Sequence, residues 1–149
     1  MNNQRDIYTP PHGPPQGNRL SPEIYSVMGE ENIYLMLEDF YRALATSSIR
    51  ELFPAESEEA MRVASRRSAD FFIFLMGGPP LYHQKHGPPM MRKRHLVFEI
   101  TESARTIWVE TFLDVLKGAE NRYRFPAQHL DSFITFLNEF SAWMVNSRA

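Results

Sequence analysis

Hydrophobic side chains recur along most of this chain at intervals of three and four residues, the spacing that places them on one face of an α-helix. No stretch shows the apolar and polar alternation expected of a half-buried strand. The pattern therefore predicts an all-α fold. The expected helices cover residues 22–28, 30–44, 57–76, 88–95, 101–117 and 126–144, with a brief turn at residues 49–53.

Polar and flexible residues mark where several of these helices begin and end. Ser57 and Thr101 stand at helix starts, where a hydroxyl can accept a hydrogen bond from an unpaired backbone N–H. Residues 77–80, Gly-Gly-Pro-Pro, end the third helix because glycine and proline interrupt helical backbone. Two segments without a helical pattern are predicted to be loops, residues 81–87 and 119–125.

The first twenty residues differ from the rest of the chain, since they are rich in proline and glycine and hold few large apolar side chains. Such a composition buries too little surface to offset the entropy lost on ordering. We therefore divide the chain into a flexible N-terminal extension, residues 1–20, and a helical domain, residues 21–149. A docking peptide for a partner protein is the alternative interpretation of the extension.

Composition narrows the classes of function. The net charge of -2 favours neither nucleic acid nor an anionic membrane, and no apolar run approaches the roughly 18 residues of a membrane helix. The chain has no cysteine, which excludes disulfides and thiolate zinc sites, and its start does not resemble a secretion signal. We expect a cytoplasmic protein. Eleven Phe and eight Met suit either a helical core or a site for a flat apolar ligand.

His95 is the most distinctive candidate residue, because the basic run Arg92-Lys93-Arg94 precedes it and the apolar run Leu96-Val97-Phe98 follows it. A buried histidine in this setting can ligate a metal, while the cations pair with carboxylates of a cofactor. The same residues allow three other interpretations. These are a partly buried histidine without a ligand, a solvated basic face, and a weak contact to nucleic acid.

Two polar aromatic residues, Tyr41 and Trp108, fall on the apolar faces of predicted helices. Either both are core residues whose polar atoms are satisfied locally, or both donate hydrogen bonds to a ligand in one pocket. His83 and His86 are three residues apart, but a zinc site needs further ligands and none is evident nearby. The sequence has no nucleotide-binding glycine loop and no Ser-His-acid signature.

The order of these features resembles the truncated haemoglobins, specifically group II of the two-over-two globins. The similarity extends over residues 21–147. Its most specific part is the pattern Arg-x-Arg-His-x-x-Phe at residues 92–98, followed by Trp108 thirteen residues after His95. The other matching pieces are Phe40-Tyr41, Phe53-Pro54, Gly77-Gly78-Pro79, Tyr82 and Gly87.

This resemblance implies a two-over-two helical sandwich around haem b, with His95 as the ligand of the iron. It implies that Tyr41 and Trp108 hydrogen-bond a bound diatomic molecule and that the small Ala64 leaves the entrance open. Ser68 departs from the family, which usually has a larger side chain there. Its hydroxyl is either a further donor near the ligand or bonds to its own helix backbone. The remaining implied haem contacts are the pocket walls Phe53, Phe71, Phe72, Met91 and Phe98 and the propionate partners Tyr82, Arg92 and Arg94.

The function implied by the resemblance is reversible binding of oxygen, carbon monoxide and nitric oxide, rather than enzymatic catalysis. Donors that slow ligand release suit sensing, nitric oxide detoxification or peroxide handling better than bulk oxygen delivery. Nitric oxide removal would require electrons from a separate reductase. We expect a monomer or a homodimer that binds neither nucleic acid nor a membrane. The alternative is a haem-free globin-like interaction or sensor module whose side chains fill the pocket.

Overall fold

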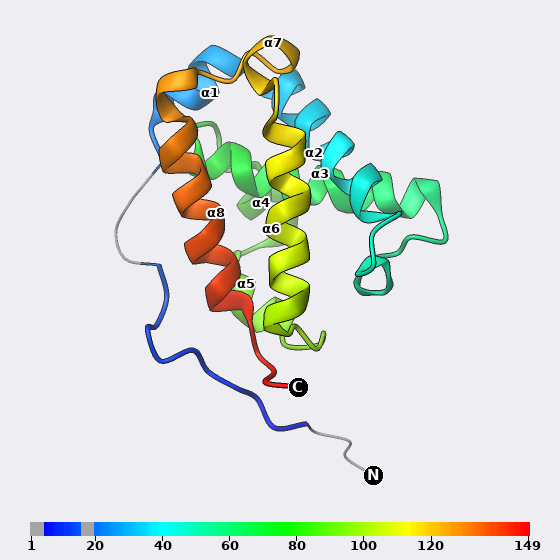
Figure 1. The fold of residues 1–149 in the computed structure, drawn as a ribbon. Helices are drawn as coiled ribbons and strands as arrows, with labels where there is room; N and C mark the ends of the chain where they lie inside the picture. Colours follow the sequence, from blue (N-terminus) through cyan, green and yellow to red (C-terminus); the bar gives the residue numbers. More distant parts are fainter. Residues whose placement is uncertain (1–4, 16–19) are drawn as a thin grey trace.

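The computed structural model describes residues 5–15 and 20–149, which are mostly helical (Figure 1). Two pairs of helices form the body: α2 packs on α3, and α6 runs antiparallel beside α8. Contacts between α2 and α6 join the two pairs. The helices are α1 Pro22–Met28, α2 Glu30–Leu44, α3 Glu58–Leu75, α4 Leu81–His86, α5 Met91–His95, α6 Glu102–Leu116, α7 Ala119–Arg122 and α8 Leu130–Met144, with 3-10 turns η1 Arg50–Leu52 and η2 Ala127–His129.

The predicted all-α class is confirmed, since the described parts of the chain contain no strand. The two predicted helix starts are also confirmed. The Ser57 hydroxyl accepts a hydrogen bond from the backbone N–H of Ala60, and the Thr101 hydroxyl accepts one from Ala104, both at 3.1 Å. Within the described residues, no helix is long and apolar enough to cross a membrane.

Residues 81–87 are not the predicted loop, because they contain helix α4. Its Lys85 ammonium lies 3.1 Å from a carboxylate oxygen of Asp70 on α3. The Asp70 side chain is only 3% exposed, and it also accepts a 2.6 Å hydrogen bond from the Tyr34 hydroxyl on α2. The contact with α3 thus stabilises α4, and a six-residue segment is too short for its own periodicity to reveal it.

Three other predicted boundaries are wrong. Helix α7 lies inside the segment predicted as the loop 119–125, and the last helix begins with η2 before the α-helical α8. Helix α5 begins at Met91 rather than at Pro88, because a residue that precedes proline avoids helical backbone and Met90 adopts the left-handed conformation with φ 39°. The helix that carries His95 therefore has only five residues.

The double glycine after α3 allows that helix end to meet α1. Gly77 has φ +94°, and a Cβ built there would lie 2.5 Å from the Cα of Pro22. A Cβ at Gly78 would lie 2.6 Å from the Ile73 side chain and 2.7 Å from the Tyr25 ring. Both positions thus exclude larger side chains, which is a packing reason for two consecutive glycines.

Four phenylalanine rings join the two helix pairs at the centre of the core. Phe40 of α2, Phe72 of α3, Phe112 of α6 and Phe133 of α8 are each at most 2% exposed. The Phe112 ring centroid lies 4.1 Å from that of Phe40, 5.8 Å from that of Phe72 and 5.6 Å from that of Phe133. This phenylalanine cluster fixes how the helix pairs are spaced.

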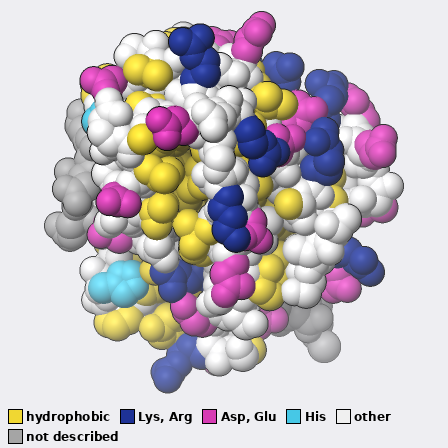
Figure 2. Space-filling model, turned by 45° about the horizontal axis from the view of Figure 1, so that its top comes forward, with side chains coloured by type: hydrophobic (Ala, Val, Ile, Leu, Met, Phe, Trp, Pro, Cys, Tyr) yellow, Lys and Arg dark blue, Asp and Glu magenta, His cyan; other side chains and the backbone are white. Residues whose placement is uncertain are grey.

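The described part of the N-terminal extension contacts the helical domain. Residues 5–15 pass the C-terminal end of the chain as an irregular segment (Figure 1), and the Tyr8 N–H donates a 2.9 Å hydrogen bond to the Asn146 carbonyl. Residues 1–4 and 16–19 lie outside the described residues, so a flexible extension over residues 1–20 stays a prediction. On the face drawn in Figure 2, acidic and basic side chains are interspersed around a group of apolar ones.

Candidate functional site

A mainly apolar cavity of about 560 Å³ lies among the helices. Its volume is within the range of cofactor and ligand sites in proteins. Side chains from α2, α3, α4, α5, α6, α8 and the turn around η1 line it. Of the sequence-predicted site residues, those that line it are Tyr41, Phe53, Ala64, Ser68, Phe71, Phe72, Tyr82, Met91, Arg94, His95, Phe98 and Trp108.

His95 lines this cavity from the last position of α5. Its Nδ1 lies 2.6 Å from the Met91 carbonyl oxygen, one helical turn earlier, so Nδ1–H donates to that carbonyl. Burial lowers the pKa of the imidazole, and the hydrogen bond to Met91 opposes that shift. A neutral ring with its proton on Nδ1 leaves the lone pair of Nε2 available to a metal.

The two polar aromatic residues meet at one phenylalanine. The Phe40 ring centroid lies 5.7 Å from that of Tyr41 and 5.4 Å from that of Trp108, with the rings near perpendicular in both pairs. Burial raises the pKa of the Tyr41 hydroxyl, and the neighbouring Ser68 hydroxyl opposes the shift. Tyr41 therefore keeps its proton at neutral pH, and a protonated hydroxyl is a hydrogen-bond donor.

The structure places Arg92 away from the cavity, which corrects the prediction that it contacts a propionate. Its guanidinium donates hydrogen bonds to the backbone carbonyls of Trp143, Val145 and Tyr8. The reason is helical geometry, because residues two apart on a helix point to nearly opposite sides. Arg94, which does line the cavity, donates to carbonyls of residues 86, 88 and 89.

Two further arginines line the cavity and were missing from the sequence-based predictions. Arg67 comes three residues after Ala64 on α3, and Arg105 comes three residues before Trp108 on α6. Each is one helical turn from a residue that was predicted, and this spacing is the signal that could have identified them. They bring two positive charges to a mainly apolar lining.

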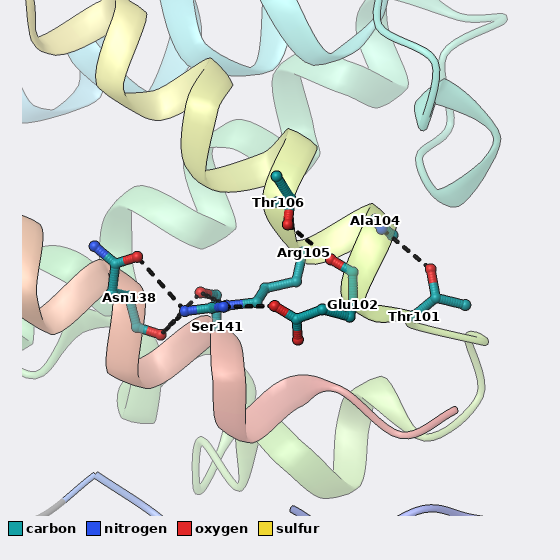
Figure 3. A network of polar contacts seen from close by, with 7 residues as sticks. All are labelled: Thr101, Glu102, Ala104, Arg105, Thr106, Asn138 and Ser141. Carbon is teal, nitrogen blue, oxygen red and sulfur yellow. Dashed lines mark hydrogen bonds and ion pairs between the residues drawn. The ribbon is translucent and has the colours of Figure 1, made fainter. Parts of the chain in front are cut away.

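Arg105 links α6 to α8 beside the cavity (Figure 3). Its Nε donates a 3.1 Å hydrogen bond to the buried Ser141 hydroxyl, and its Nη2 donates a 2.9 Å hydrogen bond to the Asn138 carbonyl. Its Nη1 lies 2.6 Å from a carboxylate oxygen of Glu102, which balances its charge. The guanidinium thus holds two walls of the cavity together.

The loop histidines of the sequence analysis do not contribute to the cavity lining. His83 and His86 belong to α4, and the His83 ring stacks edge-on against Phe74, with centroids 4.6 Å apart. Among the described residues, no group of three or more histidine, aspartate or glutamate side chains is arranged to hold a metal ion. Of the histidines in the described part of the chain, His95 is the one that lines the cavity.

Comparison with known proteins identifies the family. A sequence model of the bacterial-like globin family matches residues 23–146. The group 2 truncated hemoglobin YjbI of Bacillus subtilis (strain 168) is 33% identical over 103 residues, which cover 67% of this chain and 75% of that protein. The chain belongs to the bacterial-like globin family, and within it to the group II truncated haemoglobins.

Solved structures agree with this assignment. Phosphate-bound Hell's gate globin IV superposes with a TM-score of 0.82 and 36% identity, covering 91% of this chain and 81% of that chain. The truncated oxygen-avid haemoglobin from Bacillus subtilis gives a TM-score of 0.73 and 28% identity, covering 85% of this chain and 99% of that chain. The predicted truncated globin fold and haem as the cofactor are thereby confirmed.

The residues of this chain fit haem. The cofactor is flat and apolar with two carboxylates, and the cavity combines aromatic walls, arginine side chains and one neutral imidazole. Haem as the cofactor argues against the haem-free interaction module, which was the alternative in the sequence analysis.

The Arg105 contacts predict a specific loss of stability. Replacing Arg105 by Met should lower the free energy of unfolding by about 1–3 kcal/mol, because the buried Ser141 hydroxyl and the half-buried Asn138 carbonyl lose hydrogen bonds from a charged donor. Urea unfolding of the haem-free protein measures this change in the free energy of unfolding. Lys117→Met is the matched control: it removes an exposed ion pair with Asp114 and should cost about 0–1 kcal/mol. Equal losses in the two variants would contradict a linking role for Arg105.

Proposed function

We propose that this globin reversibly binds oxygen and other diatomic molecules at a haem iron that His95 would ligate, with Tyr41 and Trp108 as hydrogen-bond donors to the bound molecule. The observation that carries the proposal is the hydrogen bond from His95 Nδ1 to the Met91 carbonyl, which supports ligation through Nε2 into the cavity. When bound, haem supplies an iron with an open coordination position for a small ligand.

One short local contact holds the imidazole ring of His95 in place. Met91 and His95 share a face of α5 because they are four residues apart, so their hydrogen bond forms within a single turn. This bond sets the tautomer and limits rotation of the ring. The aromatic side chain of Phe98 lies on the same side of the cavity lining, with its centroid 6.4 Å from that of His95.

Tyr41 and Trp108 supply hydrogen-bond donors in a mainly apolar cavity. The Tyr41 hydroxyl and the Trp108 indole N–H would donate hydrogen bonds to a bound diatomic ligand that carries partial negative charge. In a low-dielectric pocket, each such bond stabilises the ligand by about 1–3 kcal/mol. Slow ligand release is the expected consequence, and it suits a sensor or scavenger.

Positive side chains accommodate the carboxylates of the cofactor. Arg67 on α3 and Arg94 on α5 both line the cavity, and the Arg94 guanidinium lies 5.4 Å from the Tyr82 ring centroid. We assign the propionates to Arg67, Arg94 and the Tyr82 hydroxyl, replacing Arg92 in the sequence-based set. The Arg94 contacts to backbone carbonyls hold its guanidinium in place for this role.

Loss of the His95 imidazole tests the ligand assignment. His95→Ala should abolish stable haem retention, because no other side chain in the described lining offers a histidine nitrogen. Absorption spectra of the purified protein, oxidised, reduced and reduced with carbon monoxide, provide the measurement. His129→Ala removes a histidine near Glu23, away from the lining, and should load normally. Normal haem content in the His95 variant would overturn the assignment.

The Tyr41 hydroxyl is tested by removing one atom. Tyr41→Phe should raise the oxygen dissociation rate by about fivefold to 150-fold, the kinetic equivalent of a hydrogen bond of about 1–3 kcal/mol. Stopped-flow displacement of oxygen by carbon monoxide measures the rate. Tyr123→Phe is the matched control, because that buried hydroxyl donates to Asp39 instead of lining the cavity. An unchanged rate in Tyr41→Phe would mean that its hydroxyl makes no such bond.

Nitric oxide removal is a second activity that the same donors would support. Sustained turnover consumes electrons, and the chain contains no nucleotide-binding glycine loop, so we assign their supply to a separate reductase. The oxygen-loaded protein should consume nitric oxide faster than an equal concentration of free haem, as measured with a nitric oxide electrode. Consumption no faster than that of free haem would leave oxygen binding as the function.

A further inference from the structure

The segment that follows His95 is irregular, and its backbone carbonyls are bound by a buried amide from the far end of the chain. Asn146 is fully buried, and its Nδ2 donates hydrogen bonds to the carbonyls of His95, at 3.3 Å, and Phe98, at 3.0 Å. Its Oδ1 accepts a 3.0 Å hydrogen bond from the Ile100 N–H. The C-terminal segment therefore holds the backbone of His95 itself.

Arg5, from the N-terminal extension, completes this arrangement. Its Nη2 donates to the carbonyls of Leu96, at 2.8 Å, and Phe98, and its Nη1 donates a 2.8 Å hydrogen bond to Asn146 Oδ1. One planar guanidinium thus bridges Leu96, Phe98 and the Asn146 amide. The fork of an arginine suits this task because its donors point in fixed directions.

A second arginine ties the extension down on the same side. The Arg92 Nη2 donates a 2.8 Å hydrogen bond to the Tyr8 carbonyl, and its Nη1 donates a 3.0 Å hydrogen bond to the Val145 carbonyl. The Tyr8 N–H in turn donates to the Asn146 carbonyl. The helix that carries His95, the extension and the C-terminal segment are thereby connected by hydrogen bonds.

We propose that Arg5 is a positioning residue for the proximal ligand: by fixing the carbonyls of Leu96 and Phe98, it sets the orientation in which the His95 imidazole meets the iron. Helix α5 has five residues and cannot hold that orientation alone. The inference rests on the proposed ligation by His95. It gives the contacting part of the extension a role in the haem site, in place of a passive tail.

The experiment compares the variants Arg5→Met and Arg5→Lys with the unmodified protein. In Arg5→Met, the iron–histidine stretching band of the ferrous ligand-free protein, measured by resonance Raman spectroscopy, should shift or broaden. Hemin dissociation should become about tenfold faster, the lower end of the effect of outer-shell partners on metal sites. Arg5→Lys keeps the charge and three donors and should restore part of both properties. Arg42→Met, which removes an exposed cation paired with Glu38 and Asp39, should change neither.

A measurement without haem separates positioning from general stabilisation. Amide hydrogen exchange at Phe98 and Ile100 in the haem-free protein should be faster in Arg5→Met than in Arg42→Met. An unchanged exchange rate would overturn the claim that Arg5 holds the backbone after His95. Faster exchange with an unchanged Raman band and hemin dissociation rate would overturn the positioning role. If the unmodified protein lacks the iron–histidine band, ligation by His95 is overturned and this inference with it. If the band is present in the unmodified protein and unshifted in Arg5→Met, only the inference is overturned.

Discussion

A large apolar cavity inside a small domain is the constraint on which the rest of this structure depends. Side chains on opposite walls of a cofactor site do not pack against one another, so the walls have to be held by packing elsewhere. Phe40, Phe72, Phe112 and Phe133 provide that packing, because each comes from a different long helix and all are buried. Only one of the four, Phe72, lines the cavity. The cluster therefore spaces the helices while leaving the cofactor space open.

Two charged groups that link the helices around this cavity have specific partners. The buried carboxylate of Asp70 receives the Tyr34 hydroxyl and the Lys85 ammonium, which stabilises α4 against α3. The Arg105 guanidinium is divided between the carboxylate of Glu102 and acceptors on α8 (Figure 3). Desolvated charges are costly unless they are paired, so these contacts also determine where the helices sit. The same side chains thus serve the packing of the walls and the polarity of the site.

The proximal side of the site is assembled from three distant parts of the chain. The helix with His95 is short, and its tautomer is set locally by the Met91 carbonyl. Its backbone beyond His95 is held by Asn146 near the C-terminus and by Arg5 near the N-terminus. A five-residue helix is a weak support for the ligand role proposed for His95, because isolated short helices are marginal in water. Long-range hydrogen bonds supply the rigidity that local structure lacks.

The sequence by itself determined the helical class, the long helices and most of the candidate site. Helical periodicity and the cap residues Ser57 and Thr101 are local properties, and so is the pattern that leads from Arg92 to Trp108. Only the tertiary structure decided that α4 is helical, that Arg92 faces the chain termini, that Arg67 and Arg105 line the cavity, and that Arg5 reaches the segment after His95. These outcomes depend on contacts between residues far apart in the chain. Periodicity reports which face of a helix is apolar, but it does not report which distant carbonyl or carboxylate that helix will meet.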